Sequence, residues 1–420
     1  MLGSGSLKGL DRRVWILSGG RIISTTGFSI VMPFLAIHLN RDFGTSMSEV
    51  GIIYLLMAVA GAFGQIAGGE MSDRLGRRPV MWASMALRGM VFVALFVVMG
   101  TVDSVAVIAL LLIVSSVLGS LFEPASSAMV ADLVEPGRRL EAYSLLRVGS
   151  NLGWTLGPLV SGFLIVSLPF SSLFAVAAVT CLSVAVIIYL TVADPGRSGV
   201  HHERFHPRDL LSIWHNKLFL VFCLASLPLG IVIGQMSSTF SVFSVQDVGI
   251  SEAEIGYLYA MNGAIVVLLQ FPMARYISRY RMPYVLASGT LMYAVGYFVV
   301  GFAGGIWMLV TSMIITTLGE NVTSPSSTDM VARMSPENER GRYMGAFGIF
   351  SSFGWALGPA FGGVMYDGLH GEPVALWGAV AAIAMISFFG YVHLGRMYQG
   401  TGESRLRSHE ERVKPLPPNP

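Results

Sequence analysis

The chain has 420 residues, of which 53% are hydrophobic and only 12% are charged. An ordinary soluble domain carries about 25% charged residues, so this composition excludes a soluble globular protein and indicates a membrane protein. The formal net charge of +2 gives no reason to expect a nucleic-acid partner.

Twelve predominantly apolar runs follow one another along the chain, each close to the ~20 residues that cross a bilayer as a helix. They lie at about 13–39, 48–71, 80–101, 105–134, 142–166, 171–193, 216–240, 251–276, 283–303, 305–332, 341–365 and 373–396. We therefore predict an all-α membrane protein with twelve transmembrane helices. Cys181 and Cys223 lie inside spans 6 and 7 and are expected to pack as apolar residues, not as a disulfide or a metal pair.

The basic residues predict the orientation in the membrane. Nearly all of the 27 Lys and Arg residues lie near the N-terminus, near the C-terminus or in alternate loops. Cytoplasmic loops carry such an excess. Both termini are therefore expected in the cytoplasm, and the protein in the plasma (inner) membrane.

An internal repeat divides the chain into two halves. The sequence GWTLGPLVSG, from Gly153 to Gly162, returns 201 residues later as GWALGPAFGG, from Gly354 to Gly363. Because each half has an even number of spans, the halves share one orientation and a pseudo-axis along the membrane normal. The predicted parts are an N-terminal six-helix half (1–192), a cytoplasmic linker (193–215), a C-terminal six-helix half (216–396) and a disordered cytoplasmic tail (397–420).

Two motifs resemble those of a transporter family. The loop between spans 2 and 3 reads GGEMSDRLGRRPV and is similar to the 2–3 loop motif of the major facilitator superfamily at Gly69, Asp73, Arg74, Gly76, Arg77 and Arg78. GWTLGPLVSG resembles the fifth-span motif of drug/proton antiporters, with Ser161 in place of a glycine. The resemblance spans about residues 13–396 and implies a twelve-span secondary transporter of the drug/proton antiporter type.

On this resemblance the 2–3 loop is expected to act as a conformational lock. Asp73 would lie at the positive N-terminal end of span 11, and Arg77 would bridge it to Asp132 at the end of span 4. These contacts are expected only while the cytoplasmic side is closed. The alternative is a tight basic turn without a gating role. The equivalent 8–9 loop has Ser278 in place of the aspartate, so its lock is expected to be weaker or absent.

The repeated Gly-Pro helices are expected to pack closely and to bend as the halves rock. Small residues on one face let two backbones approach each other, while a proline removes a backbone donor. Packing without a gating role is the alternative. The residues concerned are Gly153, Gly157 and Pro158 in span 5, and Gly354, Gly358 and Pro359 in span 11.

Four ionisable residues within apolar runs are the candidates for proton coupling: Arg21, Arg88, Glu123 and Glu320. Each costs at least ~2.5 kcal/mol at the bilayer centre and tends to mark a pathway or a proton relay. Desolvation favours the neutral form of a carboxyl group, so Glu123 and Glu320 are the expected proton carriers. The alternative for Glu123 is a static ion pair with Arg21 or Arg88. Span 4 lacks the arginine that such antiporters often have. Either Arg21, Arg88 or Arg147 takes its role, or proton coupling is organised differently.

Together these features predict proton-coupled efflux (antiport) of amphipathic or lipophilic small molecules by alternating access. The substrate cavity is expected to include Asn151, Trp154, Asn262 and Asn321. A sugar, metabolite or lipid transporter of the same superfamily is the alternative. The sequence has no nucleotide-binding loop and no catalytic constellation. We expect no enzyme activity, no cofactor and no metal, and we expect a monomer.

Overall fold

A computed structural model describes residues 9–102, 104–135, 138–194, 216–336 and 339–413, with side chains described as far as 398. Every regular element within these ranges is a helix. The order is α1 (Arg12–Arg41), α2 (Met47–Leu75), α3 (Arg77–Thr101), α4 (Val105–Leu133), α5 (Arg139–Leu164), α6 (Ser171–Thr191), α8 (Lys217–Gly234), η2 (Gln235–Ser237), α9 (Thr239–Gln246), α10 (Glu252–Ile277), α11 (Met282–Val300), α12 (Ile306–Met334), α13 (Arg340–Gly368) and α14 (Pro373–Val413).

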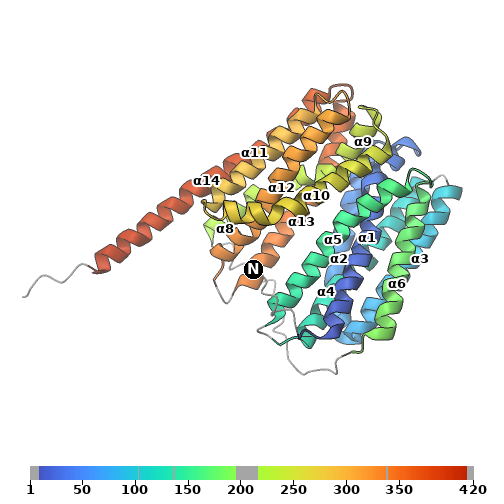
Figure 1. Cartoon of the computed structure of the whole chain (residues 1–420), viewed down its shortest axis with the longest axis horizontal. Helices are drawn as coiled ribbons and strands as arrows, with labels where there is room; N and C mark the ends of the chain where they lie inside the picture. Colours follow the sequence, from blue (N-terminus) through green and yellow to red (C-terminus); the bar gives the residue numbers. More distant parts are fainter. Residues whose placement is uncertain (1–8, 103, 136–137, 195–215, 337–338, 414–420) are drawn as a thin grey trace, which may run out of the picture.

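The helices form two bundles with the same internal packing. In the first, α1 packs on α5 and α6, α2 on α4, and α3 on α4 and α6. In the second, α8 packs on α13 and α14, α10 on α12, and α11 on α12 and α14. With α8, η2 and α9 counted as one span, this confirms the predicted fold of twelve transmembrane helices in two pseudo-symmetric halves. Figure 1 shows the bundles side by side, blue to green and yellow to red.

Matching capping boxes start α2 and α10, the second helix of each half. Ser46 accepts from the backbone N–H of Glu49, whose carboxylate accepts from the backbone N–H of Ser46. Ser251 and Glu254 make the same exchange at the start of α10. A capping box satisfies two backbone donors that have no partner within the helix, so both helices begin at fixed points.

Span 7 differs from the continuous helix that its apolar run predicts. It breaks at η2, and Ser238 has φ −139° and ψ −84°, outside the helical region. Carbonyl groups freed in a membrane need internal partners. The hydroxyl of Tyr259 donates to the Met236 carbonyl, and that of Tyr54 to the Ser237 carbonyl at 3.5 Å. Because these donors come from α10 and α2, the span's own hydropathy does not reveal the break.

Nine spans within the described residues are long and apolar enough to cross a membrane. The helices α5, α12 and α13 are not among them. Relative to their length, these three carry the most glycine, serine, threonine and charged residues. In α12 many of these polar groups are buried, whereas on α5 some, such as Asn151, are exposed.

Residues 397–413, predicted as part of a disordered tail, are the end of a helix. The helix α14 continues through this segment to Val413 and extends beyond the bundle at the lower left of Figure 1. Residues 397–413 contain no proline and several strong helix formers, including Glu, Arg and Leu, so an ongoing helix can propagate through them. Residues 414–420, and all of the predicted linker after Asp194, lie outside the described residues.

Candidate functional site

The candidate transport pathway lies between the two bundles, which meet at one end. We call this the far end, where α1 and α5 end and α2 and α10 begin; the basic end is the opposite one, where α1 begins and α2 ends. Figure 1 shows the bundles close together at the far end, at the top, and diverging towards the basic end.

Glycines allow the backbones of the two halves to touch at the far end. A Cβ on Gly51 of α2 would lie 2.5 Å from the Ala360 Cα of α13. A Cβ on Gly256 of α10 would lie 2.3 Å from the Gly162 Cα of α5. Any side chain at these positions would clash with backbone, so these glycines are required for the observed approach.

Glycines near the basic end are free of such contact. A Cβ on Gly69 of α2, or on Gly345 or Gly348 of α13, would meet nothing within 4 Å. A hydrogen bond of 3.5 Å from Arg147 of α5 to Thr328 of α12 joins the halves nearer this end. The halves are therefore tightly packed at the far end and make few contacts towards the basic end, and we call this conformation open at the basic end.

Two polar contacts strengthen the packing at the far end. Asp367, at the end of α13, accepts from the backbone N–H groups of Met47 (3.1 Å) and Ser48 (2.7 Å) at the start of α2. A carboxylate at a helix N-terminus accepts hydrogen bonds from the free N–H groups and is stabilised by the positive end of the helix dipole. Glu252, at the start of α10, contacts Arg41 and His38 of α1.

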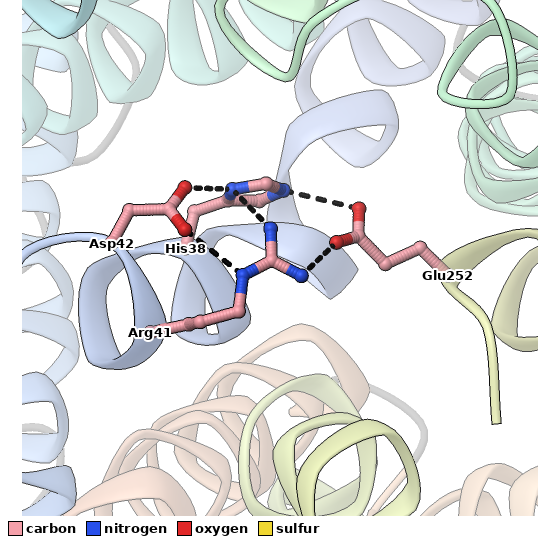
Figure 2. A network of polar contacts seen from close by, with 4 residues as sticks. All are labelled: His38, Arg41, Asp42 and Glu252. Atoms are coloured by element: carbon pink, nitrogen blue, oxygen red, sulfur yellow. Dashed lines mark hydrogen bonds and ion pairs between the residues drawn. The ribbon is translucent and has the colours of Figure 1, made fainter. Parts of the chain in front are cut away.

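Figure 2 shows the second contact as a network of four residues, His38, Arg41, Asp42 and Glu252. Arg41 Nη1 lies 2.6 Å from Glu252 Oε1, and His38 Nε2 lies 3.1 Å from Glu252 Oε2. His38 Nδ1 lies 2.5 Å from Asp42 Oδ2. Glu252 is more than 200 positions from the other three residues, so the network was not predicted from the sequence. A signal was available, since Arg41 is an isolated basic residue on the side otherwise poor in Lys and Arg.

Burial favours the protonated form of Asp42, but hydrogen bonds from His38 and Arg41 outweigh it and hold the pKa of this carboxyl group below its ordinary value. A pKa that is lower in the folded than in the unfolded protein stabilises the fold at neutral pH, and the contribution is lost as pH falls through the lowered pKa.

We expect Asp42→Asn to destabilise the protein at pH 6–7 by at most about 1 kcal/mol, because the side chain is 43% exposed and solvent screens it. Thermal unfolding in detergent should show this difference shrinking below about pH 4. A stability difference between the two proteins that stays constant down to pH 3 would contradict this role of the Asp42 carboxylate.

Within the N-terminal half, Arg21 and Glu123 form an ion pair. Arg21 Nη2 of α1 lies 3.1 Å from Glu123 Oε1 of α4. The arginine side chain is 10% exposed and the glutamate side chain is 49% exposed. The pair matches the static-ion-pair alternative for Glu123, and its role in proton coupling stays a prediction.

Arg88 of α3 is buried beside this pair and contacts neutral groups. Its Nε donates to Ser115 Oγ at 3.2 Å. Its guanidinium lies over the rings of Phe28, at 4.9 Å, and Phe92, at 5.3 Å. Gly119 leaves room for it, because a Cβ there would lie 2.4 Å from Arg88 Cζ. Cation–π contacts of this kind favour a desolvated guanidinium.

Glu320 of α12 lies in the C-terminal half among neutral groups. Asn262 Nδ2 of α10 donates to Glu320 Oε2 at 3.0 Å and also to Thr317 Oγ1 at 3.0 Å. None of the contacts described for Glu320 involves Lys, Arg or His. Stacked rings of Tyr297 and Trp377, 5.5 Å apart, belong to the same half. The structure thus brings together two predicted residues, Glu320 and Asn262.

The other predicted cavity residues differ in their surroundings. Asn151 is exposed, and Trp154 is 41% exposed with its edge on Phe28 at 5.9 Å. Asn321 is only 2% exposed, and both of its amide atoms lack a hydrogen-bond partner among the described residues. Asn321 therefore does not line an open cavity in this conformation. It points away from the face that carries Glu320, because adjacent helix positions face different directions.

The 2–3 loop makes part of the predicted lock. Arg77 contacts Asp73 on the same segment and Asp132 at the end of α4, the latter at 3.2 Å. The Asp73 side chain is 66% exposed, and no described contact takes it to α13. On the predicted orientation, with the basic end in the cytoplasm, the ion pairs of Arg77 do not require a closed cytoplasmic side. They lie within one half and persist while the basic end is open.

We expect Asp73→Asn to reduce transport by about tenfold, because a hydrogen bond to a charged group is worth roughly 1.5–3 kcal/mol and 1.4 kcal/mol is a factor of ten. The substitution would destabilise the conformation that is closed at the basic end, in which Asp73 is expected to contact α13. Ser278→Ala, at the equivalent position of the second half, is the matched control and should change transport less than twofold by the same scale. Initial transport rates in proteoliposomes measure both, and equal effects would contradict the lock.

Comparison with known proteins identifies the family. The Major Facilitator Superfamily matches at residues 17–246 and 229–417. The chain is 27% identical over 372 residues to "Multidrug resistance protein MdtH" of Klebsiella pneumoniae (strain 342), covering 86% of this chain and 89% of the relative. It is 25% identical over 408 residues to "Uncharacterized MFS-type transporter YqjV" of Bacillus subtilis (strain 168), covering 96% and 97%.

Solved structures agree on the fold. The nucleoside transporter NupG superposes with a TM-score of 0.76 at 13% identity, over 91% of this chain and 99% of that one. A bacterial homolog of the human lysosomal transporter Spinster, in an inward-facing and unoccupied conformation, superposes with a TM-score of 0.74 at 16% identity, over 92% and 98%. The matched motifs, the paired six-helix bundles and the span of these matches agree with one another, and the chain belongs to the Major Facilitator Superfamily of membrane transporters.

Proposed function

We propose that this chain exports amphipathic or lipophilic small molecules in exchange for protons. The multidrug resistance relatives, which match over most of their length, support efflux. The positive-inside rule supports a cytoplasmic location for the basic end and for both termini, in the inner membrane. On this orientation the conformation described above is open to the cytoplasm, ready to take up substrate from inside the cell.

Glu320 is the observation that carries the proposal. Its carboxylate is held by the neutral donor Asn262 within the membrane and has no described cationic neighbour. Such a group can gain and lose a proton without breaking an ion pair, since its environment disfavours charge without fixing it. In the outward-open state Glu320 would take up a proton from outside, and in the inward-open state it would release that proton to the cytoplasm as substrate binds.

The test is substrate-dependent proton flux in proteoliposomes that contain the purified protein and a pH-sensitive dye. A proton gradient is imposed, and lipophilic cations, neutral drugs, sugars and lipids are added in separate experiments. We expect proton release coupled to export of amphipathic compounds. Proton flux coupled only to sugars or lipids would favour a sugar, metabolite or lipid transporter. Substrate transport that does not depend on the proton gradient would contradict proton coupling.

A further inference from the structure

The membrane-embedded part of the N-terminal half carries more positive than negative charge. Arg21 on α1 and Arg88 on α3 lie near one carboxylate, Glu123 on α4. Glu123 pairs with Arg21 at 3.1 Å, while Arg88 is held by the hydroxyl of Ser115 and by aromatic rings. We propose that Arg21 and Arg88 bind an anionic group, a carboxylate or a phosphate, of the transported amphipathic molecule. This inference rests on the proposed transport function and adds a substrate class to it.

Unused donors on Arg21 point to a ligand. The residue is 9% exposed, yet its Nε has no hydrogen-bond partner among the described residues, and its Nη2 has only the ion pair with Glu123 at 3.1 Å. Glu123 supplies charge without an aligned hydrogen bond to either atom. A guanidinium presents its donors in a planar fork that matches a carboxylate or a phosphate with two parallel bonds. Leaving buried donors unpaired is costly, and an anionic ligand would remove that cost.

The cluster is accessible from the space between the halves. The side chain of Glu123 is 49% exposed, and contact of a carboxylate with lipid at this depth would be costly. Its exposed side therefore faces the pathway. Ser115, Gly119 and Glu123 follow one another at four-residue intervals and share one face of α4. An anion arriving along the pathway meets Glu123 first and competes with it for Arg21.

Apolar surface adjoins the cluster, as an amphipathic ligand requires. Arg88 lies over one side of the Phe28 ring at 4.9 Å, and Trp154 of α5 meets the same ring edge-on at 5.9 Å. Trp154 is 41% exposed. A ligand with its acidic group at Arg21 and Arg88 would have Trp154 within reach of its apolar part. The C-terminal half offers no equivalent, since no described contact brings an arginine to Glu320.

The test is a pair of nearly isosteric probes, 1-naphthylacetate and the neutral 1-naphthylacetamide, titrated calorimetrically into the full chain in nanodiscs. We expect the carboxylate to bind about tenfold or more tightly than the amide, the gain expected of a charge-assisted hydrogen bond. Arg21→Gln and Arg88→Gln should lower carboxylate affinity to that of the amide and leave amide binding unchanged. Glu123→Gln should raise carboxylate affinity, because the competing carboxylate is gone. Titration with 1-naphthyl phosphate distinguishes a phosphate from a carboxylate preference.

Arg139→Gln, which removes a positive charge from the basic end of α5, is the matched control and should leave both affinities unchanged. Unchanged amide binding shows that each variant is folded. The proposal is overturned if the wild-type protein binds both probes equally or neither, if Arg21→Gln weakens both probes alike, or if Glu123→Gln weakens carboxylate binding. Failure of the proposed efflux would be seen separately, as anion binding without any substrate-coupled proton flux.

Discussion

Replacing Glu320 with glutamine is expected to reduce gradient-driven export of cationic substrates to the level of empty proteoliposomes while the protein still folds and inserts. A glutamine keeps a side-chain oxygen that accepts from Asn262, now at 3.0 Å from the carboxylate, and has nearly the same volume. It cannot exchange a proton. Substrate-dependent proton flux and substrate efflux are measured in the same proteoliposomes, with thermal unfolding in detergent as the check on folding.

Two comparisons sharpen this experiment. Asn262→Ala removes the donor to Glu320 but leaves the carboxylate, so export should weaken and proton coupling should persist. Export of neutral substrates is expected to suffer less from Glu320→Gln than export of cations, since only cations need the negative charge. If Glu320→Gln leaves proton-coupled transport of every substrate class unaltered, the carrier role passes to Glu123 or is abandoned.

The elements that were predicted correctly are those determined by local sequence. Twelve apolar runs of membrane-spanning length gave the spans, and the repeat at Gly153 and Gly354 predicted the common packing of the two halves. Some contacts between neighbouring helices were also anticipated. The contact of Arg77 with Asp132 followed from the motif, and an ion pair of Glu123 with Arg21 or Arg88 was the alternative to proton coupling, since burying either charge alone is costly.

The elements that were missed depend on partners distant in sequence. The break in span 7 is stabilised by tyrosine hydroxyl groups of α2 and α10, so an apolar run alone predicts a continuous helix. The far-end network joins His38 to Glu252 across the two halves. Asn321 is next to Glu320 in sequence, yet their side chains have different environments, because a helix turns by about 100° at each residue. Polar residues in one span therefore do not by themselves define a cavity.

Glycine substitutions at the two ends of the pathway are expected to trap opposite conformations. At the far end, Gly256→Leu places a side chain where a Cβ alone would lie 2.3 Å from the Gly162 Cα. The halves cannot then approach as observed, so the far end should stay open. At the basic end, Gly69 has nothing within 4 Å in the present conformation. Gly69→Leu is therefore tolerated here, but it should obstruct α2 when the basic end closes.

Distances between spin labels at each end measure this directly. The only cysteines, Cys181 and Cys223, are both buried, and their replacement by alanine gives a background for labelling. One pair of labels, at Thr101 and Phe302, reports on the far end, and another, at Thr191 and Tyr280, reports on the basic end. Gly256→Leu and Gly69→Leu should each lose at least about 90% of transport activity. A steric clash of this size costs more than the ~1.4 kcal/mol that corresponds to a factor of ten.

The sign of each distance change separates conformational trapping from misfolding. Gly256→Leu should lengthen the far-end distance and shorten the basic-end distance, whereas Gly69→Leu should keep both distances at the values of the present conformation. Gly304→Leu, in the loop after α11 with no atom within 4 Å of a Cβ, is the control and should leave transport and distances unchanged. A shift of both variants in the same direction would contradict the assignment of one glycine contact to each state. A longer far-end and shorter basic-end distance in Gly256→Leu, with no change of either distance in Gly69→Leu, would show that the glycines at the two ends determine which side of the pathway opens.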